Sequence, residues 1–250
     1  MNLTVKGVVL KETSYGEGDK VLTVLAEGIG KMQIWAKGAR RVKSALLSAS
    51  HPFTYSEFTL VEKKGSYYCN SASVLESHFK LRGDLEKLSL AGYFAELVSA
   101  VAQEGEQEDE LMRLFMNALY LLTYTNKTQA HVKAVFELRL MTIAGYAPEL
   151  NSCVRCGNTE HRLVAFDLSG GTVCENCASS VIFIPAAIHK ALVFVTEGNE
   201  KSIFSFTLTP DVQKIFSALC ENYVIRQLDT EFKTLAFYKS LFGGLNEQNR

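Results

Sequence analysis

The spacing of apolar residues changes once along this chain, at about Asp84. Between Leu3 and about Ser77, apolar and polar residues alternate, and β-branched and aromatic side chains are frequent. Such alternation is typical of strands that bury one face. Beyond Asp84 the apolar residues recur at the spacing of helices. The sequence therefore predicts an α+β protein of more than one domain, with a β domain at residues 1–80 and a helical domain at residues 81–250.

The β region divides into five predicted strands, separated by polar or glycine-containing turns. Their bounds are residues 3–14, 20–27, 30–38, 53–64 and 66–76. Five short antiparallel strands in a region of this length suit a small closed barrel of the OB type. The longest gap, at residues 39–52, separates the third strand from the fourth. We therefore expect an N-terminal five-stranded OB-type β-barrel that carries one long loop.

The region after Asp84 is predicted to form an α-helical bundle. The expected helices span residues 85–102, 110–124, 130–145, 185–196, 210–225 and 231–242. The third is apolar almost all round, which is typical of a helix buried at the centre of a bundle. It should end at Gly145, because glycine favours a helix C-terminus and Pro148 stands just beyond as a stop.

Four of the six cysteines form a compact motif: Cys153, Cys156, Cys174 and Cys177. Their spacing, C-x2-C-x17-C-x2-C, is typical of a four-cysteine zinc site. We expect one zinc ion, in a module inserted into the helical domain at about residues 150–180. Four thiolates leave no ligand position for an activated water, so this zinc should be structural. The alternative is a chain that has lost the metal or forms disulfides.

The residues around these cysteines favour a structural role for the module. Segments 164–166 and 171–173 should pair as a hairpin that joins the two cysteine pairs. Only Arg155 and Arg162 are cationic between the outer cysteines, which is a weak footprint for phosphate. We therefore favour a zinc module that stabilises the fold over a zinc ribbon that binds DNA. The other two cysteines, Cys69 and Cys220, are expected to be buried small apolar residues.

The long barrel loop begins with a cluster of cations, Lys37, Arg40, Arg41 and Lys43, within seven residues. The whole chain is nearly neutral, with 26 Lys and Arg against 27 Asp and Glu. Residues 1–80, however, carry a net charge of +4 and residues 81–150 one of −4. Arginine is favoured at phosphates because its guanidinium donates two parallel hydrogen bonds. We predict that these four residues bind DNA; the alternative is a solvated turn that aids solubility.

Aromatic residues near the loop are candidates for base stacking, as on barrels that bind single strands. Trp35 and Tyr67 are the first candidates, and Tyr15 and Tyr68 accompany them. Each of these rings is also compatible with a place in the core.

Motifs of several other protein classes are absent from the sequence. There is no G-x-x-x-x-G-K-[ST] loop for a nucleotide, no G-x-S-x-G and no H-E-x-x-H. We therefore predict no catalytic residues and do not expect an enzyme. No window reaches eighteen uninterrupted apolar residues, and the N-terminus alternates. A cytoplasmic protein without a membrane segment is expected.

Four stretches, in this order, resemble the bacterial RecO family of DNA repair proteins: KGARRVKS, HPFTYSEFTLVEKKG, LESHFKLRGDLEKLSLAGYFAELV and FELRLMTIAGYAPELNSCVRCG. The resemblance runs along nearly the whole chain and is thinnest towards its C-terminus. It implies an OB-fold, a helical domain and, in many members, a four-cysteine zinc module. The four loop cations match the family's basic barrel loop, and the four clustered cysteines match its zinc ligands.

The resemblance also implies a function as a recombination mediator associated with the nucleoid. Such a protein binds single- and double-stranded DNA, anneals complementary strands and hydrolyses no nucleotide. It works with RecR and helps RecA load onto strands coated by single-strand-binding protein. The tail of single-strand-binding protein would dock on the helical domain, where cations such as Arg113, Lys127, Lys133 or Arg139 would serve. The alternative is a zinc-stapled interaction scaffold whose barrel binds protein, and whose nucleic-acid binding need not depend strongly on salt.

Overall fold

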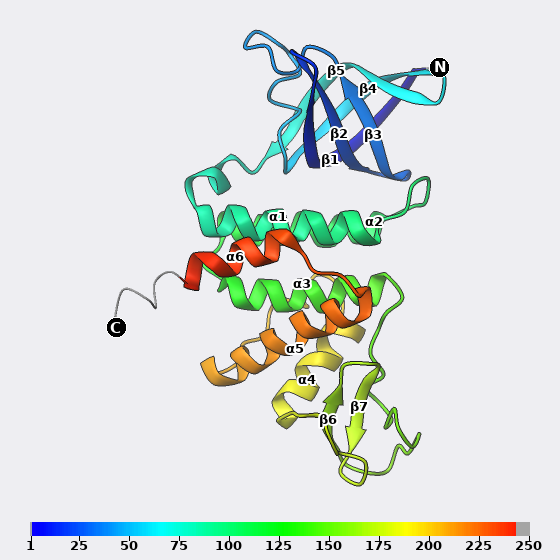
Figure 1. Cartoon of the computed structure of the whole chain (residues 1–250), viewed down its shortest axis with the longest axis vertical. Coiled ribbons are helices and arrows are strands. Elements are labelled where there is room, and N and C mark those ends of the chain that lie inside the picture. The colour runs from blue at the N-terminus through cyan, green and yellow to red at the C-terminus, as the bar shows by residue number, and fades with distance from the viewer. Residues whose placement is uncertain (1, 244–250) are drawn as a thin grey trace. The chain divides into compact units, whose positions relative to one another are not determined.

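The computed structural model describes residues 2–243 of the chain, with side chains described to residue 241 (Figure 1). By its contacts the described chain divides into two compact units. The first comprises residues 2–125 and 232–243, and the second comprises residues 126–231. The predicted division at residue 80 separates strands from helices, whereas the contacts group three helices with the barrel. The division into a DNA-binding domain at residues 1–80 and a helical domain at residues 81–250 stays a prediction.

Five strands form the closed barrel of the first unit. They are β1 (Asn2–Tyr15), β2 (Asp19–Ala26), β3 (Gly30–Ala36), β4 (Thr54–Lys63) and β5 (Ser66–Ser77). The order around the barrel is β1-β2-β3-β5-β4, and β4 pairs with β1 to close it. All pairs are antiparallel except β3 with β5, which is parallel. The predicted five-stranded OB-type barrel is confirmed.

One strand, β1, closes the barrel by pairing on both sides. Its first half pairs with β4, where Leu3 is opposite Leu60, and its second half pairs with β2, where Glu12 is opposite Leu22. A bulge between Val9 and Lys11 interrupts the register. A bulge bends a strand and increases its twist, so β1 can pass from one neighbour to the other.

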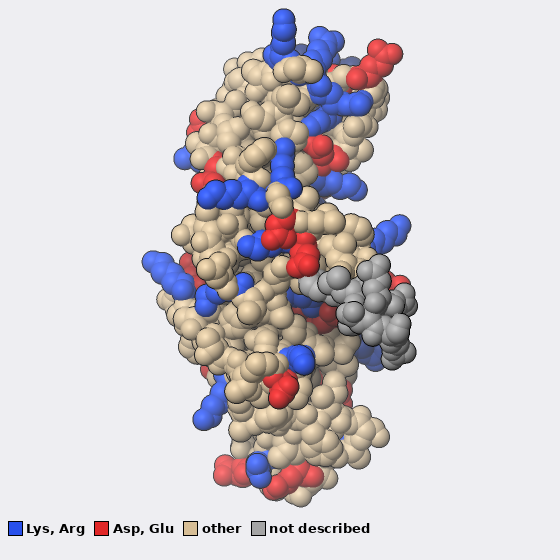
Figure 2. All heavy atoms as spheres, turned by 90° about the vertical axis from the view of Figure 1, so that its left-hand side faces the viewer, with Lys and Arg blue, Asp and Glu red and all other residues tan. Residues whose placement is uncertain are grey.

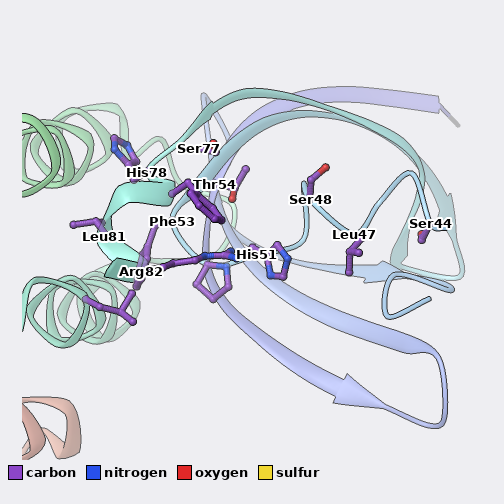
Figure 3. Close-up of a pocket in the computed structure, with 13 residues that line it drawn as sticks. Ser44, Leu47, Ser48, His51, Phe53, Thr54, Ser77, His78, Leu81 and Arg82 are labelled. Atoms are coloured by element: carbon purple, nitrogen blue, oxygen red, sulfur yellow. The ribbon is translucent and has the colours of Figure 1, made fainter. Parts of the chain in front are cut away.

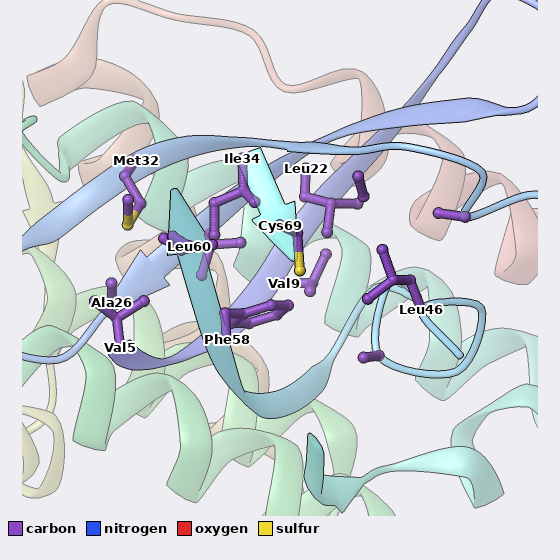
Figure 4. Close-up of a cluster of buried hydrophobic side chains, with 14 residues drawn as sticks. Val5, Val9, Leu22, Ala26, Met32, Ile34, Leu46, Phe58, Leu60 and Cys69 are labelled. Carbon is purple, nitrogen blue, oxygen red and sulfur yellow. The ribbon is translucent and has the colours of Figure 1, made fainter. Parts of the chain in front are cut away.

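Alternate residues of the strands point inward and fill the barrel. The core includes Val5, Val9, Leu22, Met32, Ile34, Phe58, Leu60 and Cys69 (Figure 4). Full burial of an aliphatic or phenylalanine side chain contributes roughly 1.5–3 kcal/mol, so this cluster contributes to the stability of the barrel. Cys69 is 9% exposed within it, and burial raises the pKa of its thiol to about 11. It is a buried apolar residue, as predicted.

The first unit also contains a short 3-10 helix, η1 (Phe79–Gly83), and three α-helices, α1 (Leu85–Val101), α2 (Asp109–Tyr124) and α6 (Lys233–Gly243). Asp84 caps α1 by accepting a hydrogen bond from the Lys87 N–H at 3.0 Å. The C-terminal segment returns to α1, where the rings of Phe232 and Tyr93 lie 5.8 Å apart. The helices were predicted, whereas η1 was not.

The second unit is built around α3 (Gln129–Ile143), which packs against α4 (Ala186–Glu197) and α5 (Pro210–Leu228). Ten of the fifteen residues of α3 are buried, which agrees with its largely apolar sequence. Cys220 of α5 is fully buried, also as predicted. The unit also holds a sheet of three strands in the order β7-β6-β8, with β6 at Leu163–Asp167, β7 at Gly171–Cys174 and β8 at Ile182–Phe183.

Two cations of α3 have structural roles inside this unit. Lys133 is 3% exposed, and its Nζ lies 2.8 Å from carboxylate oxygens of both Glu137 and Glu221. Burial opposes its charge, but the two carboxylates outweigh burial and raise the pKa of Lys133. Arg139 donates hydrogen bonds to carbonyl oxygens at the C-terminus of α4, at 2.7 Å for Thr196. Lys133 is therefore poorly placed to contact a partner, and docking by the other cations of the helical domain stays a prediction.

None of the described helices has the length and the apolar character that crossing a membrane requires.

Candidate nucleic-acid interface and cysteine cluster

The long loop between β3 and β4 leaves the barrel through a turn at Gly38. Its φ is +67°, a conformation that residues other than glycine adopt only with strain. The Gly38 N–H donates to Asp19 Oδ1 at 2.7 Å, which fixes the turn against the start of β2. Further turns follow, with the Arg41 N–H donating to the Gly38 carbonyl and the Ser44 N–H to the Arg41 carbonyl. The loop is thus ordered by its own backbone.

Apolar residues of the loop hold it to the barrel while its cations face outward. Ala39 is fully buried and Leu46 is 8% exposed, and both belong to the barrel core. The Arg40 N–H also donates to the Gly18 carbonyl at 3.0 Å. The buried residues anchor the loop to the barrel, and the exposed cations between them point to solvent.

The four loop cations, Lys37, Arg40, Arg41 and Lys43, are all exposed. Arg40 donates from Nη1 to the Gly16 carbonyl at 3.2 Å, and Arg41 lies against the backbone of Gly18 and Gly38. Within residues 2–241, no ion pair joins any of the four to a carboxylate. Figure 2 shows Lys and Arg side chains standing out over the barrel on the face that it presents. No carboxylate of the described residues neutralises this positive charge.

Three aromatic rings lie together beside the cations. Trp35 and Tyr15 meet edge to face with centroids 4.9 Å apart, and Trp35 and Tyr68 stack at 6.3 Å. Lys37 Nζ lies 5.7 Å from the centre of the Tyr68 ring. Tyr15 is 57% exposed and Trp35 is half-buried. Rings of this kind next to cations form a surface on which bases can stack.

The position of Tyr67 differs from that of these three rings. In the β3–β5 pairing, Trp35 is opposite Tyr68, and Tyr67 is opposite the buried Ile34. Tyr67 packs against the barrel core. The structure therefore places Tyr68, not Tyr67, beside Trp35, and base stacking by any of them stays a prediction.

The four clustered cysteines come together in the second unit. Their Sγ atoms all lie within 4.8 Å of one another, and those of Cys156 and Cys174 are 3.8 Å apart. A tetrahedral ion with metal–sulfur bonds of about 2.3 Å places its sulfurs about 3.8 Å apart. The donor set and its spacing therefore fit one metal ion.

Local backbone structure explains why these cysteines converge. Each pair sits on a turn, closed by the Gly157 N–H on the Cys153 carbonyl at 2.7 Å and by the Cys177 N–H on the Cys174 carbonyl at 3.0 Å. The hairpin β6–β7 joins the two turns, as predicted. Burial opposes ionisation of Cys153, but hydrogen bonds from the backbone of Cys174 and Arg155 outweigh it and lower the pKa of this thiol to about 6. A thiolate is the form that binds metal.

Arg155 is a structural residue of this cluster. Its Nη1 donates to the carbonyl oxygens of Cys177 and Ser179, both at 2.8 Å, and its Nη2 lies 3.1 Å from Asp167 Oδ2. The guanidinium of Arg155, in the turn of the first cysteine pair, thus contacts the turn of the second cysteine pair and the end of β6. The sequence showed the cation but not these partners.

Comparison with known families covers both parts of the chain. Residues 1–78 match the family described as Recombination protein O N terminal, and residues 82–236 match Recombination protein O C terminal. The chain belongs to the RecO family. A protein of Acetivibrio thermocellus named DNA repair protein RecO is 34% identical over 96% of this chain and 97% of its own length.

Two further relatives extend this comparison. Proteins with the same name from Alkaliphilus metalliredigens and Clostridium perfringens are each 32% identical, over 96% and 83% of this chain. They are covered over 100% and 85% of their own lengths. RecO family membership supports a function in DNA repair and recombination.

Proposed function

We propose that this RecO family chain is a non-enzymatic recombination mediator that binds single- and double-stranded DNA through its basic barrel loop. The observation that carries the proposal is the set of four exposed, unneutralised cations beside the Tyr15–Trp35–Tyr68 cluster. The cations would hold phosphates and the rings would stack bases. Neither contact reads base edges, so little sequence preference is expected.

The proposed mechanism requires no bond chemistry. Cations that hold two strands near one face reduce their mutual repulsion, and annealing of complementary strands follows. The partners we propose are RecR and single-strand-binding protein, with RecA loading onto the strand as the indirect outcome. The site of action would be the cytoplasm, at the nucleoid.

The proposed metal is one structural zinc ion, held by the four clustered cysteines. When bound, zinc ties the two turns and the β6–β7 hairpin into one module. With four thiolates as ligands, no open position would remain for substrate.

The test is fluorescence anisotropy of a labelled single-stranded oligonucleotide over a range of salt concentrations. The loop variant, Lys37/Arg40/Arg41/Lys43→Ala, is compared with a control variant, Lys6/Lys11/Lys190/Lys214→Ala. The control removes the same charge from exposed lysines outside the loop. Each phosphate contact on a single strand contributes about 0.7 to the log–log salt slope, so the loop variant should flatten the slope by roughly three units. The control should remain near wild type.

Equal slopes in the loop variant, the control and the wild type would contradict the proposal. Binding that is weak and nearly independent of salt in all three would favour the alternative, a metal-stapled scaffold whose barrel binds protein.

A further inference from the structure

The first unit contains a cavity of about 360 Å³ (Figure 3). One wall is the second half of the long loop, from Ser44 to Phe53, and another is η1. Ligand sites typically measure roughly 300–1,000 Å³, so this one has the size for a small occupant such as one nucleotide. Its walls come from segments far apart in the sequence.

The lining of the cavity favours an anion. None of the residues that line it is acidic, and four of them carry hydroxyl groups: Ser44, Ser48, Thr54 and Ser77. His51 lines it as well, and Figure 3 shows Arg82 extending from η1 towards His51. The Glu12 carboxylate lies beside His51, with 3.8 Å between Glu12 Oε2 and His51 Nδ1. The same Glu12 oxygen pairs with Lys20 Nζ at 2.5 Å. No carboxylate of the described residues lines the cavity itself, and the carboxylate beside His51 is paired with Lys20.

Arg82 brings the positive charge to this cavity. It is exposed, and it has no ion pair or hydrogen bond within the described residues. Its guanidinium lies 5.2 Å from the centre of the Phe79 ring, which is 68% exposed. Burial, Arg82 and Lys20 together lower the pKa of His51, so that His51 offers a neutral imidazole at pH 7. An exposed ring next to an unpaired guanidinium is suited to a base and its phosphate.

The cavity and the proposed DNA site share one loop of the chain. Ser44 follows Lys43 directly, and its N–H donates to the Arg41 carbonyl at 2.9 Å. The segment that displays the loop cations thus runs on as the wall of the cavity.

We propose that this cavity binds one nucleotide of the single strand that the basic loop holds. The phosphate contacts Arg82 and His51, and the base stacks on Phe79. This inference rests on the proposed function, since the loop holds the strand in place. An acidic peptide is the competing occupant, and the loop that the cavity shares with the cations favours DNA over it.

The test compares Arg82→Ala with Lys80→Ala in binding to labelled oligothymidylate at several salt concentrations. Both cations lie on η1 and are exposed, but only Arg82 lines the cavity. Arg82→Ala should flatten the log–log salt slope by about 0.7, the value of one phosphate contact. It should weaken binding about threefold to tenfold, as loss of one charge-assisted contact does. Lys80→Ala should match the wild type.

A second variant, Ser48→Phe, places a large side chain in the lining of the cavity without removing charge. Ser48 is exposed, so the larger side chain leaves the barrel core intact. Ser48→Phe should weaken binding of a 30-nucleotide labelled oligothymidylate. The log–log salt slope of that binding should stay unchanged. If Arg82→Ala and Ser48→Phe both bind the 30-mer as the wild type does, the proposal is overturned.

The loop variant, run in the same series, separates the two proposals. Loss of binding in the loop variant with wild-type binding in Arg82→Ala and Ser48→Phe would overturn the cavity alone. Wild-type binding in the loop variant would overturn the proposed function. Arg82-dependent binding of a labelled hexaglutamate peptide, with DNA binding unchanged, would assign the cavity to a protein partner and overturn the inference.

Discussion

The arginines of the barrel loop and the arginine of the cysteine cluster differ in what they contact. Arg155 donates to two carbonyl oxygens and pairs with a carboxylate, all within its own module. Arg40 contacts one carbonyl oxygen, and Arg41 lies on glycine backbone without an ion pair in the described part of the chain. Cations with unused donors indicate a binding surface, whereas cations with satisfied donors indicate structure.

The two regions also differ in what holds them folded. The barrel encloses a large apolar core, whereas the core of the cysteine module is Ala165, Val173 and the two buried cysteines, Cys153 and Cys174, with partly buried neighbours. Small modules with little core commonly depend on a metal. The module should therefore lose its structure when a ligand is removed, and the barrel should not.

The largest effect is expected for Cys174→Ser. Structural zinc contributes about 10–16 kcal/mol of binding free energy in zinc-finger peptides at pH 7, so loss of one thiolate should abolish the metal and unfold the module. The metal content by mass spectrometry should fall from one zinc per chain to near zero, while DNA binding by the barrel persists. Cys220→Ala, which removes a buried cysteine outside the cluster, should retain its zinc. Stoichiometric zinc in Cys174→Ser would refute the ligand set.

Arg155→Ala and Arg40→Ala should have opposite effects. Arg155→Ala removes hydrogen bonds within the cysteine module and should destabilise the second unit by about 1–3 kcal/mol, with DNA affinity unchanged. Arg40→Ala should weaken DNA binding and leave the unfolding midpoint unchanged. Thermal unfolding and anisotropy, measured on both variants, check this contrast. Weakened DNA binding in Arg155→Ala would contradict this contrast, because an arginine whose donors are satisfied within the chain would then bind DNA as well.

Gly38→Ala should destabilise the barrel by about 1–2 kcal/mol, because its φ of +67° lies in the left-handed region. The matched change is Gly92→Ala in α1, where an added Cβ would meet no atom within 4 Å. That variant should gain about 0.5–1 kcal/mol. Urea unfolding followed by the fluorescence of Trp35, the single tryptophan, reports on this unit. Equal midpoints for the two variants would show that the loop turn carries no strain.

The smallest effect is expected from pH. Burial lowers the pKa of His78 below its usual 6.5, although Glu76 opposes the shift. The folded state therefore favours neutral His78, and this stability is present above pH 6.5 and is lost as the pH falls through the lowered pKa. Urea midpoints measured by Trp35 fluorescence should decrease between pH 7.5 and pH 5. An NMR titration of His78 with a midpoint at or above 6.5 would contradict this assignment.

Much of the fold could be predicted from the sequence because the strands and helices carry clear hydrophobic periods. Each of the five strands lies within about two residues of its prediction. The short helix η1 was missed because five residues show no helical period. The return of α6 to α1 was also missed, since a contact such as Thr234 with Glu96 leaves no local signal.

The candidate site was predicted in part. The cations and cysteines were found because they are close together in the sequence. Alternation could not decide between Tyr67 and Tyr68, because two adjacent tyrosines fit either face until the β3–β5 register is known. The cavity at Arg82 could not be predicted either, because its walls come from separate segments.

The central claim is that DNA lies on the barrel loop and its aromatic cluster, and the emission of Trp35 tests it most directly. Trp35 is the only tryptophan and stacks on Tyr68 next to Lys37. Titration of the wild type with unlabelled oligothymidylate should quench Trp35 emission, with the midpoint that anisotropy gives, and the loop variant should lose both signals together. Binding of the oligonucleotide by anisotropy without any change in Trp35 emission would place the DNA elsewhere and contradict the account.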